Sequence, residues 1–219
     1  MLQKIFTFFF ISFLLISSAV AHTDVRRNAL PGTVTLSFDD GPSPTTTPQI
    51  LAILKKNHIH ATFFMVGANA EKYPNLVKDV LADGNVIASH TWSHPMLTKI
   101  SDKQLQHEVL ATQHVLEKIT GEKPLCLRYP FGASNEHVRD YIRSQDITPM
   151  PMGWNSFDYE RPGTQKIIAQ ILNNAHSGQV FLMHDGFPEA NRSQTIAALQ
   201  PIIDGIRKKG LGFSTVCGG

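Results

Sequence analysis

The segment TVTLSFDDGP, Thr33–Pro42, joins a run of β-branched and apolar residues to two adjacent aspartates and a Gly-Pro pair. The run is typical of a parallel strand that is buried on both faces. Aspartate is depleted in strands, and two adjacent carboxylates repel each other. One interpretation of the pair is a turn, since Asp, Gly and Pro all favour turns. The alternative is a functional site at the end of a strand, and the rest of the chain decides between the two.

Short apolar runs alternate with longer amphipathic stretches along the chain. The runs predict strands over Thr33–Phe38, Ala61–Gly67, Asn85–Ser89, Leu125–Tyr129, a short segment near Met150–Trp154, Gln179–His184 and Gly212–Val216. The amphipathic stretches predict helices over Thr47–Asn57, Glu71–Ala82, a segment from a capping box at Ser101 to Gly121, Asn135–Ser144, Gln165–Ala175 and Thr195–Lys209. Repeated strand–helix units imply one α/β domain with a parallel sheet of about seven strands, closed or open.

The first 21 residues have the pattern of a secretory signal peptide. Lys4 precedes an apolar run, and small residues end at Ala21 in an A-x-A arrangement. An uncleaved membrane anchor is the alternative, because the run is close to the lower length limit for spanning a bilayer. We expect cleavage near Ala21, a secreted or periplasmic protein, and one domain over residues 22–219.

Charge and cysteine content limit the classes of partner. The formal net charge is +2 at pH 7, and no basic stripe is present, so we expect no nucleic-acid partner. We also expect no stable membrane partner and a monomer. Cys126 and Cys217 can form a disulfide in an exported chain, and a pair of buried thiols is the alternative.

Ionisable side chains follow five of the predicted strands. They are Asp39 and Asp40, His90 and His94, Arg128, Asp158, and His184. Parallel strands bring their carboxyl ends to one edge of a sheet, where α/β folds place their active sites. We therefore expect these side chains to form one site. Histidines in predicted helices or connections are expected to be solvated: His58, His60, His107, His114, His137 and His176.

Asp40, His90 and His94 supply the ligand types of a catalytic zinc site. Two imidazoles and one carboxylate leave coordination positions open for water and substrate, as metal-dependent hydrolysis requires. Neighbouring residues at a strand end point in different directions, so Asp39 can accept a proton from the attacking water while Asp40 binds the metal. Adjacent carboxylates also argue against a glycosidase, in which the acid and base face each other across the sugar.

Five segments of the chain together resemble the motifs of the NodB-like polysaccharide deacetylases, carbohydrate esterase family 4. SFDDGP, HTWSH, RYPFG, DYERPG and FLMH occur in the order of the family, over Thr33–Val216. The resemblance implies a distorted (β/α) barrel and the metal-dependent removal of acetyl groups from N-acetylated sugars.

The resemblance also implies catalytic roles. Asp39 would be the general base and His184 the general acid that protonates the leaving amine. Arg128 would orient the base, and Asp158 would tune His184. The metal ligands would be Asp40, His90 and His94, holding a divalent ion, with Zn2+ preferred and Co2+ or Ni2+ as alternatives.

Substrate contacts are implied at the same edge. The backbone N–H of Phe131 would help to stabilise the oxyanion, and Leu182 would line the acetyl pocket. The fourth motif departs from the family pattern, because Tyr159 replaces a tryptophan and Asn155 stands where an aspartate is common. Tyr159 still offers a flat apolar wall. Trp154 lies on the same edge, where its ring can stack on a sugar or pack within the fold.

The sequence thus predicts an exported, metal-dependent amidohydrolase that deacetylates GlcNAc-type sugars of peptidoglycan or chitin-like polymers. Its partner would be an acetylated polysaccharide or oligosaccharide. An O-acetyl xylan esterase is the nearest alternative, since the same site can cleave esters. A non-catalytic carbohydrate-binding protein is a further alternative, which the filled catalytic positions disfavour.

Overall fold

The computed structural model describes residues 25–186 and 191–218. The predicted signal peptide, residues 1–21, and the expected cleavage after Ala21 lie outside the described residues. Within them, no helix combines the length and the apolar character that crossing a membrane requires.

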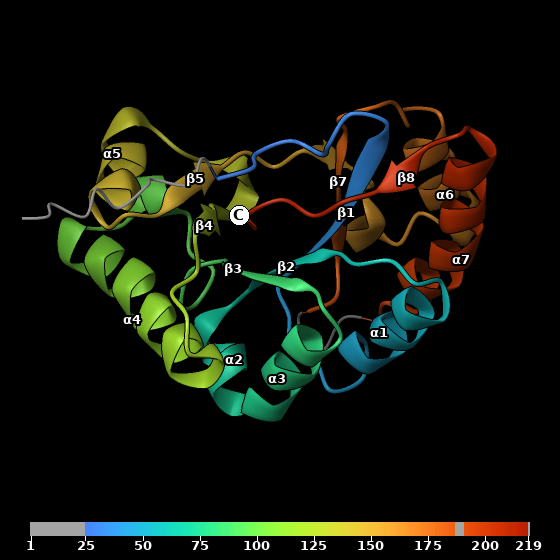
Figure 1. The fold of residues 1–219 in the computed structure, drawn as a ribbon. Helices are drawn as coiled ribbons and strands as arrows, with labels where there is room; N and C mark the ends of the chain where they lie inside the picture. Colours follow the sequence, from blue (N-terminus) through green and yellow to red (C-terminus); the bar gives the residue numbers. More distant parts are fainter. Residues whose placement is uncertain (1–24, 187–190, 219) are drawn as a thin grey trace, which may run out of the picture.

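Parallel strands form one curled sheet with β1 near its middle (Figure 1). The described strands are β1 (Thr33–Asp39), β2 (Thr62–Met65), β3 (Val86–Ser89), β4 (Cys126–Arg128), β5 (Thr148–Met150), β6 (Trp154–Asn155), β7 (Val180–His184) and β8 (Gly212–Phe213). Their order is β5-β4-β3-β2-β1-β7-β6, and β8 pairs with the first residues of β1. Because these pairings are parallel, the carboxyl ends of the strands share one edge.

Helices cover the outside of the curled sheet (Figure 1). The described α-helices are α1 (Thr47–Lys56), α2 (Gly67–Lys72), α3 (Pro74–Ala82), α4 (Asp102–Thr120), α5 (Glu136–Ser144), α6 (Thr164–Leu172) and α7 (Ser193–Lys208). Short 3-10 turns are η1 (Leu97–Lys99), η2 (Pro130–Gly132) and η3 (Asp158–Glu160). The predicted distorted (β/α) barrel is confirmed. It is open, because β5 and β6 end the sheet without pairing with each other in the described part of the chain.

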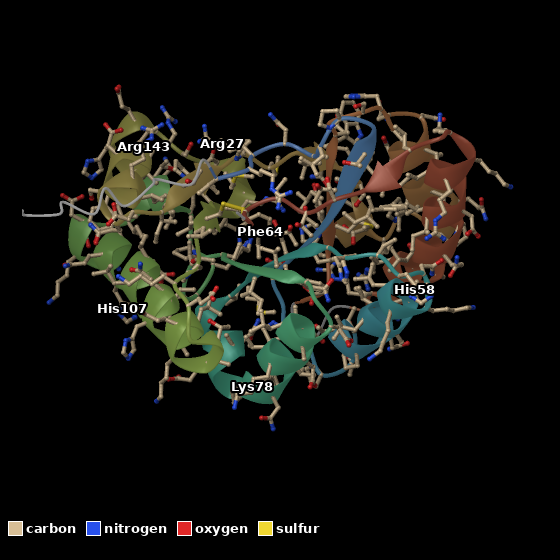
Figure 2. The ribbon with its side chains drawn as sticks, viewed as in Figure 1. Arg27, His58, Phe64, Lys78, His107 and Arg143 are labelled. Carbon is tan, nitrogen blue, oxygen red and sulfur yellow. A yellow bond between two sulfur atoms is a disulfide. The ribbon has the colours of Figure 1, made fainter. Side chains whose placement is uncertain are left out.

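Both faces of the sheet are buried, as the strand β2 illustrates. Phe63 stacks on Phe38, with ring centroids 5.1 Å apart, in the core that the outer helices cover. Its neighbour Phe64 belongs to a second apolar cluster. Figure 2 shows Phe64 among the strands, whereas Lys78 and His107 extend away from α3 and α4. Two-sided burial explains why the strands are continuous apolar runs rather than alternating ones.

The predicted helix Glu71–Ala82 is wrong in extent. Two helices, α2 and α3, replace it, and they meet at Tyr73, whose φ of −127° and ψ of 56° are not helical. Pro74 explains the break, because a proline disfavours the helical conformation in the residue before it and cannot donate a backbone hydrogen bond.

The predicted strand near Met150–Trp154 is also divided. β5 ends at Met150 and pairs with β4, whereas β6 begins at Trp154 and pairs with β7 at the opposite end of the sheet. Pro151 and Gly153 separate the two strands, and Gly153 has a φ of 76°. A left-handed residue after a proline turns the chain out of the first strand.

Other local predictions hold. Ser101 and Gln104 form the predicted capping box of α4, and the helix ends at Gly121 with a φ of 83°. The six histidines expected to be solvated are exposed: His58, His60, His107, His114, His137 and His176.

The two cysteines form a disulfide, which is the first of the two alternatives. Cys126 and Cys217 have Cα atoms 5.6 Å apart and a sequence separation of 91 residues. Cys126 lies in β4, and Cys217 follows β8, which pairs with β1. The bond therefore links one half of the open barrel to the C-terminal segment that crosses to the other half (Figure 1).

The disulfide should contribute strongly to stability because it closes a long loop in the unfolded chain. We expect the double variant Cys126→Ser/Cys217→Ser to lose about 2–5 kcal/mol of unfolding free energy. Guanidinium unfolding followed by circular dichroism measures this loss. Dithiothreitol should lower the midpoint of the wild type and leave that of the double variant unchanged. Equal midpoints for the oxidised wild type and the double variant would contradict the expectation.

Candidate active site

The carboxyl ends of the strands surround a cavity of about 480 Å³. The predicted residues that line it are Asp39, Asp40, His90, His94, Phe131, Tyr159, Leu182 and His184. Arg128 and Asp158 lie behind this lining, and both are buried. The residues that follow five different strands therefore come together as the parallel topology requires.

Three side chains form a cluster suited to a metal ion. Ligand atoms of Asp40, His90 and His94 all lie within 4.8 Å of one another. Asp40 Oδ1 is 3.4 Å from His90 Nε2 and 3.3 Å from His94 Nε2, and this buried oxygen has no hydrogen-bond donor. A carboxylate oxygen is costly to bury without a partner. A divalent cation would satisfy it, and the donor set of one carboxylate and two imidazoles fits such an ion.

The protonation of this cluster also suits metal binding. Burial alone would raise the pKa of Asp40, but the neighbouring His90, His184 and His94 outweigh it and lower the pKa to about 2. Burial and the nearby His90 lower the pKa of His94 to about 4. Asp40 is therefore ionised and His94 neutral at pH 7, the forms in which both bind metals.

His90 is oriented by a backbone contact. Its Nδ1 lies 2.7 Å from the carbonyl oxygen of Arg128, which can only accept, so Nδ1 carries the proton. Nε2 then presents its lone pair to the cluster, an arrangement typical of metal-binding histidines. Burial lowers the pKa of His90, but the carboxylates of Asp39 and Asp40 outweigh burial and raise it. A cation would compete with the proton for the same lone pair.

Asp39 is held apart from the cluster by an arginine. Arg128 Nη1 donates to Asp39 Oδ1 at 2.6 Å and to Ser37 Oγ at 3.0 Å. The second carboxylate oxygen, Asp39 Oδ2, lies 3.6 Å from His90 Nε2. Arg128 is fully buried, and its guanidinium carbon lies 3.8 Å from the ring centroid of Phe64. One oxygen of Asp39 is thus fixed, and the other faces the metal cluster.

His184 and Asp158 form the second polar pair of the site. His184 Nδ1 lies 2.6 Å from Asp158 Oδ1, and Asp158 Oδ2 accepts from the His184 backbone N–H and from Thr195 Oγ1. Burial lowers the pKa of His184, but Asp158 outweighs burial and raises the pKa above its ordinary value. His184 is directly opposite Asp39 in the pairing of β7 with β1.

Glu108, which was not predicted, holds the loop between the two histidines. It is buried on α4, where it accepts hydrogen bonds from the Ser93 N–H at 2.8 Å and from Ser93 Oγ at 2.6 Å. The flanking residues Thr91 and His94 have φ values of 69° and 62°. Left-handed conformations are costly for such residues, so external contacts must hold the loop. A signal existed: Glu108 lies three residues after Leu105, beside the apolar stripe of its helix.

The predicted substrate residues divide into two groups. Phe131, Tyr159 and Leu182 line the cavity, and the ring centroid of Tyr159 lies 5.4 Å from that of His184. Trp154 does not line it. Successive residues of a strand point to opposite faces, and Asn155, the next residue of β6, lines the cavity instead. The predicted contact of Trp154 with substrate is therefore transferred to Asn155.

Further cavity residues had no signal in the sequence. Tyr129, Gly132, Met152, Phe157 and Arg192 also contribute to the lining. Asp185, directly behind the cavity, is fully buried, and burial raises its pKa to about 7. Its carboxylate accepts from Thr47 Oγ1 at 2.6 Å, and it would collide with any Cβ atom at Gly41.

Comparison with known families gives one match. The Polysaccharide deacetylase profile covers residues 26–150. A peptidoglycan-N-acetylglucosamine deacetylase of Bacillus cereus is 37% identical over 84% of this chain and 85% of its own length. A chitooligosaccharide deacetylase of Azorhizobium caulinodans is 30% identical, covering 81% of this chain and 90% of its own length. The peptidoglycan-N-acetylmuramic acid deacetylase PdaC of Bacillus subtilis is 36% identical over 69% of this chain, which spans 32% of PdaC.

Solved structures show the same fold. The Bc1960 peptidoglycan N-acetylglucosamine deacetylase has a TM-score of 0.81 and 33% identity, covering 85% of this chain and 88% of its own. A family 4 carbohydrate esterase from Streptomyces lividans has a TM-score of 0.76 and 30% identity, covering 86% of this chain and 92% of its own.

The role of Glu108 can be measured through metal affinity. We expect Glu108→Ala to weaken zinc binding about 10–100-fold, because the loop that carries His94 loses both of its contacts through Ser93. Glu108→Gln keeps an acceptor for one of them and should lose less. Competition with a chelating dye gives the dissociation constant. The exposed Glu122→Gln serves as the control, and an unchanged zinc affinity in Glu108→Ala would contradict the role.

Proposed function

Because the chain belongs to the polysaccharide deacetylase family, we propose that it hydrolyses N-acetyl groups of GlcNAc-type sugars in peptidoglycan or chitin-like polymers. The observation that carries the proposal is the juxtaposition in one cavity of the Asp40, His90 and His94 cluster with Asp39 and His184. The relatives whose names specify peptidoglycan N-acetylglucosamine and chitooligosaccharide support these substrate classes.

A divalent metal ion is part of the proposal. Asp40, His90 and His94 would hold it, and the unpartnered Asp40 Oδ1 supports the assignment. Zn2+ is our first choice, and Co2+ or Ni2+ suits the same donors. When bound, such an ion polarises the acetyl carbonyl and lowers the pKa of the attacking water.

The protein's own residues supply the proton transfers. Asp39 accepts a proton from the attacking water as the new C–O bond forms, while Arg128 keeps one of its oxygens fixed. The N–H of Phe131 donates to the developing oxyanion. His184 then gives its proton to the amide nitrogen as the C–N bond breaks, releasing acetate and the free amine. Asp158 stabilises the protonated imidazole until this step.

Export is a separate part of the proposal. Residues 1–21 have the pattern of a signal peptide, and we propose cleavage near Ala21 and a secreted or periplasmic mature chain of residues 22–219. The Cys126–Cys217 disulfide supports this proposal, because such bonds persist in oxidising compartments. Within the mature chain we propose one catalytic domain that acts as a monomer.

The proposed function is tested by acetate release from a panel of substrates. Purified residues 22–219 loaded with zinc should release acetate from peptidoglycan fragments or chitooligosaccharides, and EDTA should abolish the release. Release from acetylated xylan alone would establish the esterase alternative. Binding of these sugars without acetate release, at full zinc occupancy, would indicate a carbohydrate-binding protein.

Asp39 and His94 should fail in different ways. We expect Asp39→Asn to keep zinc and lose at least about 100-fold in kcat, since an amide cannot accept the proton. His94→Ala should instead lose the metal itself, because it removes one of three ligands. Elemental analysis and acetate assays separate the two results. Turnover at the wild-type rate by Asp39→Asn would rule out its role as the base.

The pH dependence of kcat/KM should reflect His184. Burial lowers the pKa of His184, but Asp158 raises it further, so the protonated acid persists to higher pH than an ordinary imidazole would. Activity is therefore retained below the raised pKa and lost as the pH rises through it. Asp158→Asn should move this alkaline limb to lower pH and reduce kcat. The exposed pair His137–Asp102 offers a control, since Asp102→Asn should leave the profile in place. An alkaline limb that does not move in Asp158→Asn would contradict the assignment.

A further inference from the structure

Arg192 is a buried cation in the wall of the catalytic cavity. It directly precedes α7, is 6% exposed, and lines the cavity together with Asp39, Asp40 and His184. None of the proposed catalytic steps uses it. Arginine is rarely buried to this degree unless it is paired with an anion.

The nearby carboxylates are committed to other partners. Asp39 is bound by Arg128, and Asp158 is bound by His184 and Thr195. Asp40 belongs to the metal cluster. Among the described residues, ion pairs involve other cations, so no carboxylate lies within 4.0 Å of the Arg192 guanidinium.

One hydrogen bond orients the guanidinium and leaves its fork available. Arg192 Nε donates to the carbonyl oxygen of Gly186 at 3.1 Å. This is the hydrogen bond that the guanidinium makes within residues 25–186 and 191–218. Nη1 and Nη2 are also not among the sealed, unpaired atoms of the structure, in contrast to Nη2 of Arg128. A guanidinium fixed through Nε presents two parallel N–H groups, which match the two oxygens of a carboxylate.

We propose that Arg192 binds a carboxylate of the ligand inside the catalytic cavity. This inference rests on the proposed function and adds a substrate class to it: N-acetylated sugars whose ring, or whose neighbouring ring, carries an acidic substituent. Product acetate offers the same group. The two sources are distinguished by experiment, and both require the guanidinium fork of Arg192.

The first measurement is binding, which does not depend on turnover. The full mature chain loaded with zinc is titrated by calorimetry with a GlcNAc–MurNAc disaccharide, with the same disaccharide carrying its carboxylate as an amide, and with sodium acetate. We expect the acid to bind about tenfold or more tightly than the amide. Arg192→Gln should reduce this ratio toward one, and Arg192→Lys should keep part of it as a point charge. Arg143→Gln, at an exposed arginine on α5, is the control and should leave the ratio unchanged.

A purely structural role for Arg192 predicts a different result. Arg192→Gln would then weaken the acid and the amide equally, leave their ratio intact, and overturn the inference. An acid-to-amide ratio near one in the wild type, with an acetate dissociation constant that rises about tenfold in Arg192→Gln, would support the inference with acetate as the source. A ratio near one with acetate binding unchanged overturns it. If Arg192→Gln fails to fold by circular dichroism, the wild-type ratio and Arg192→Lys decide in the same way.

Failure of the proposed function would be visible separately. A wild-type chain that binds the acid more tightly than the amide but releases no acetate from any N-acetylated sugar would retain the carboxylate site and lose the deacetylase assignment. A chain that deacetylates neutral chitooligosaccharides, with no preference for acid over amide and no Arg192-dependent acetate binding, would retain the activity and lose this inference.

Discussion

The ion pair between Arg128 and Asp39 spans the inside of the curled sheet. The two residues lie on β4 and β1, which β3 and β2 separate, so along a flat sheet they would be about 14 Å apart. Their atoms nevertheless meet at 2.6 Å, with the guanidinium resting on Phe64 of β2. The contact therefore exists only if the sheet curls. The same curl brings the ends of β3, β1 and β7 around one cavity, so the proposed chemistry depends on it.

Within that frame the polar residues have separate tasks. Each proposed proton carrier has one partner behind it, Arg128 for Asp39 and Asp158 for His184. Asp40 alone has a buried oxygen aimed at two imidazoles and no donor. Adjacent aspartates thus differ because their surroundings differ. Asp40 leaves the strand with a φ of 75°, which separates its direction from that of Asp39.

Local patterns predicted the fold class, most elements and the residues that follow the strands, because periodicity and the carboxyl-end rule act over short distances. Sequence patterns could not predict which face a two-residue strand such as β6 presents, so Trp154 was placed in the site in place of Asn155. The disulfide depends on tertiary proximity across 91 residues. Arg192 lacks any local signal, since its importance comes from burial and from the commitment of every nearby carboxylate to another partner.

The central position of β1 has a consequence for biosynthesis. β1 emerges early from the ribosome, and β2 soon covers one of its edges, but β7 and β8 are made last; Ser37 and its hydrogen-bond acceptor Phe181 are 144 residues apart. Until then the nascent chain carries an exposed apolar edge, a surface that invites aggregation and chaperone binding. The register that sets Asp39 opposite His184 therefore closes only at the end of translation or after translocation.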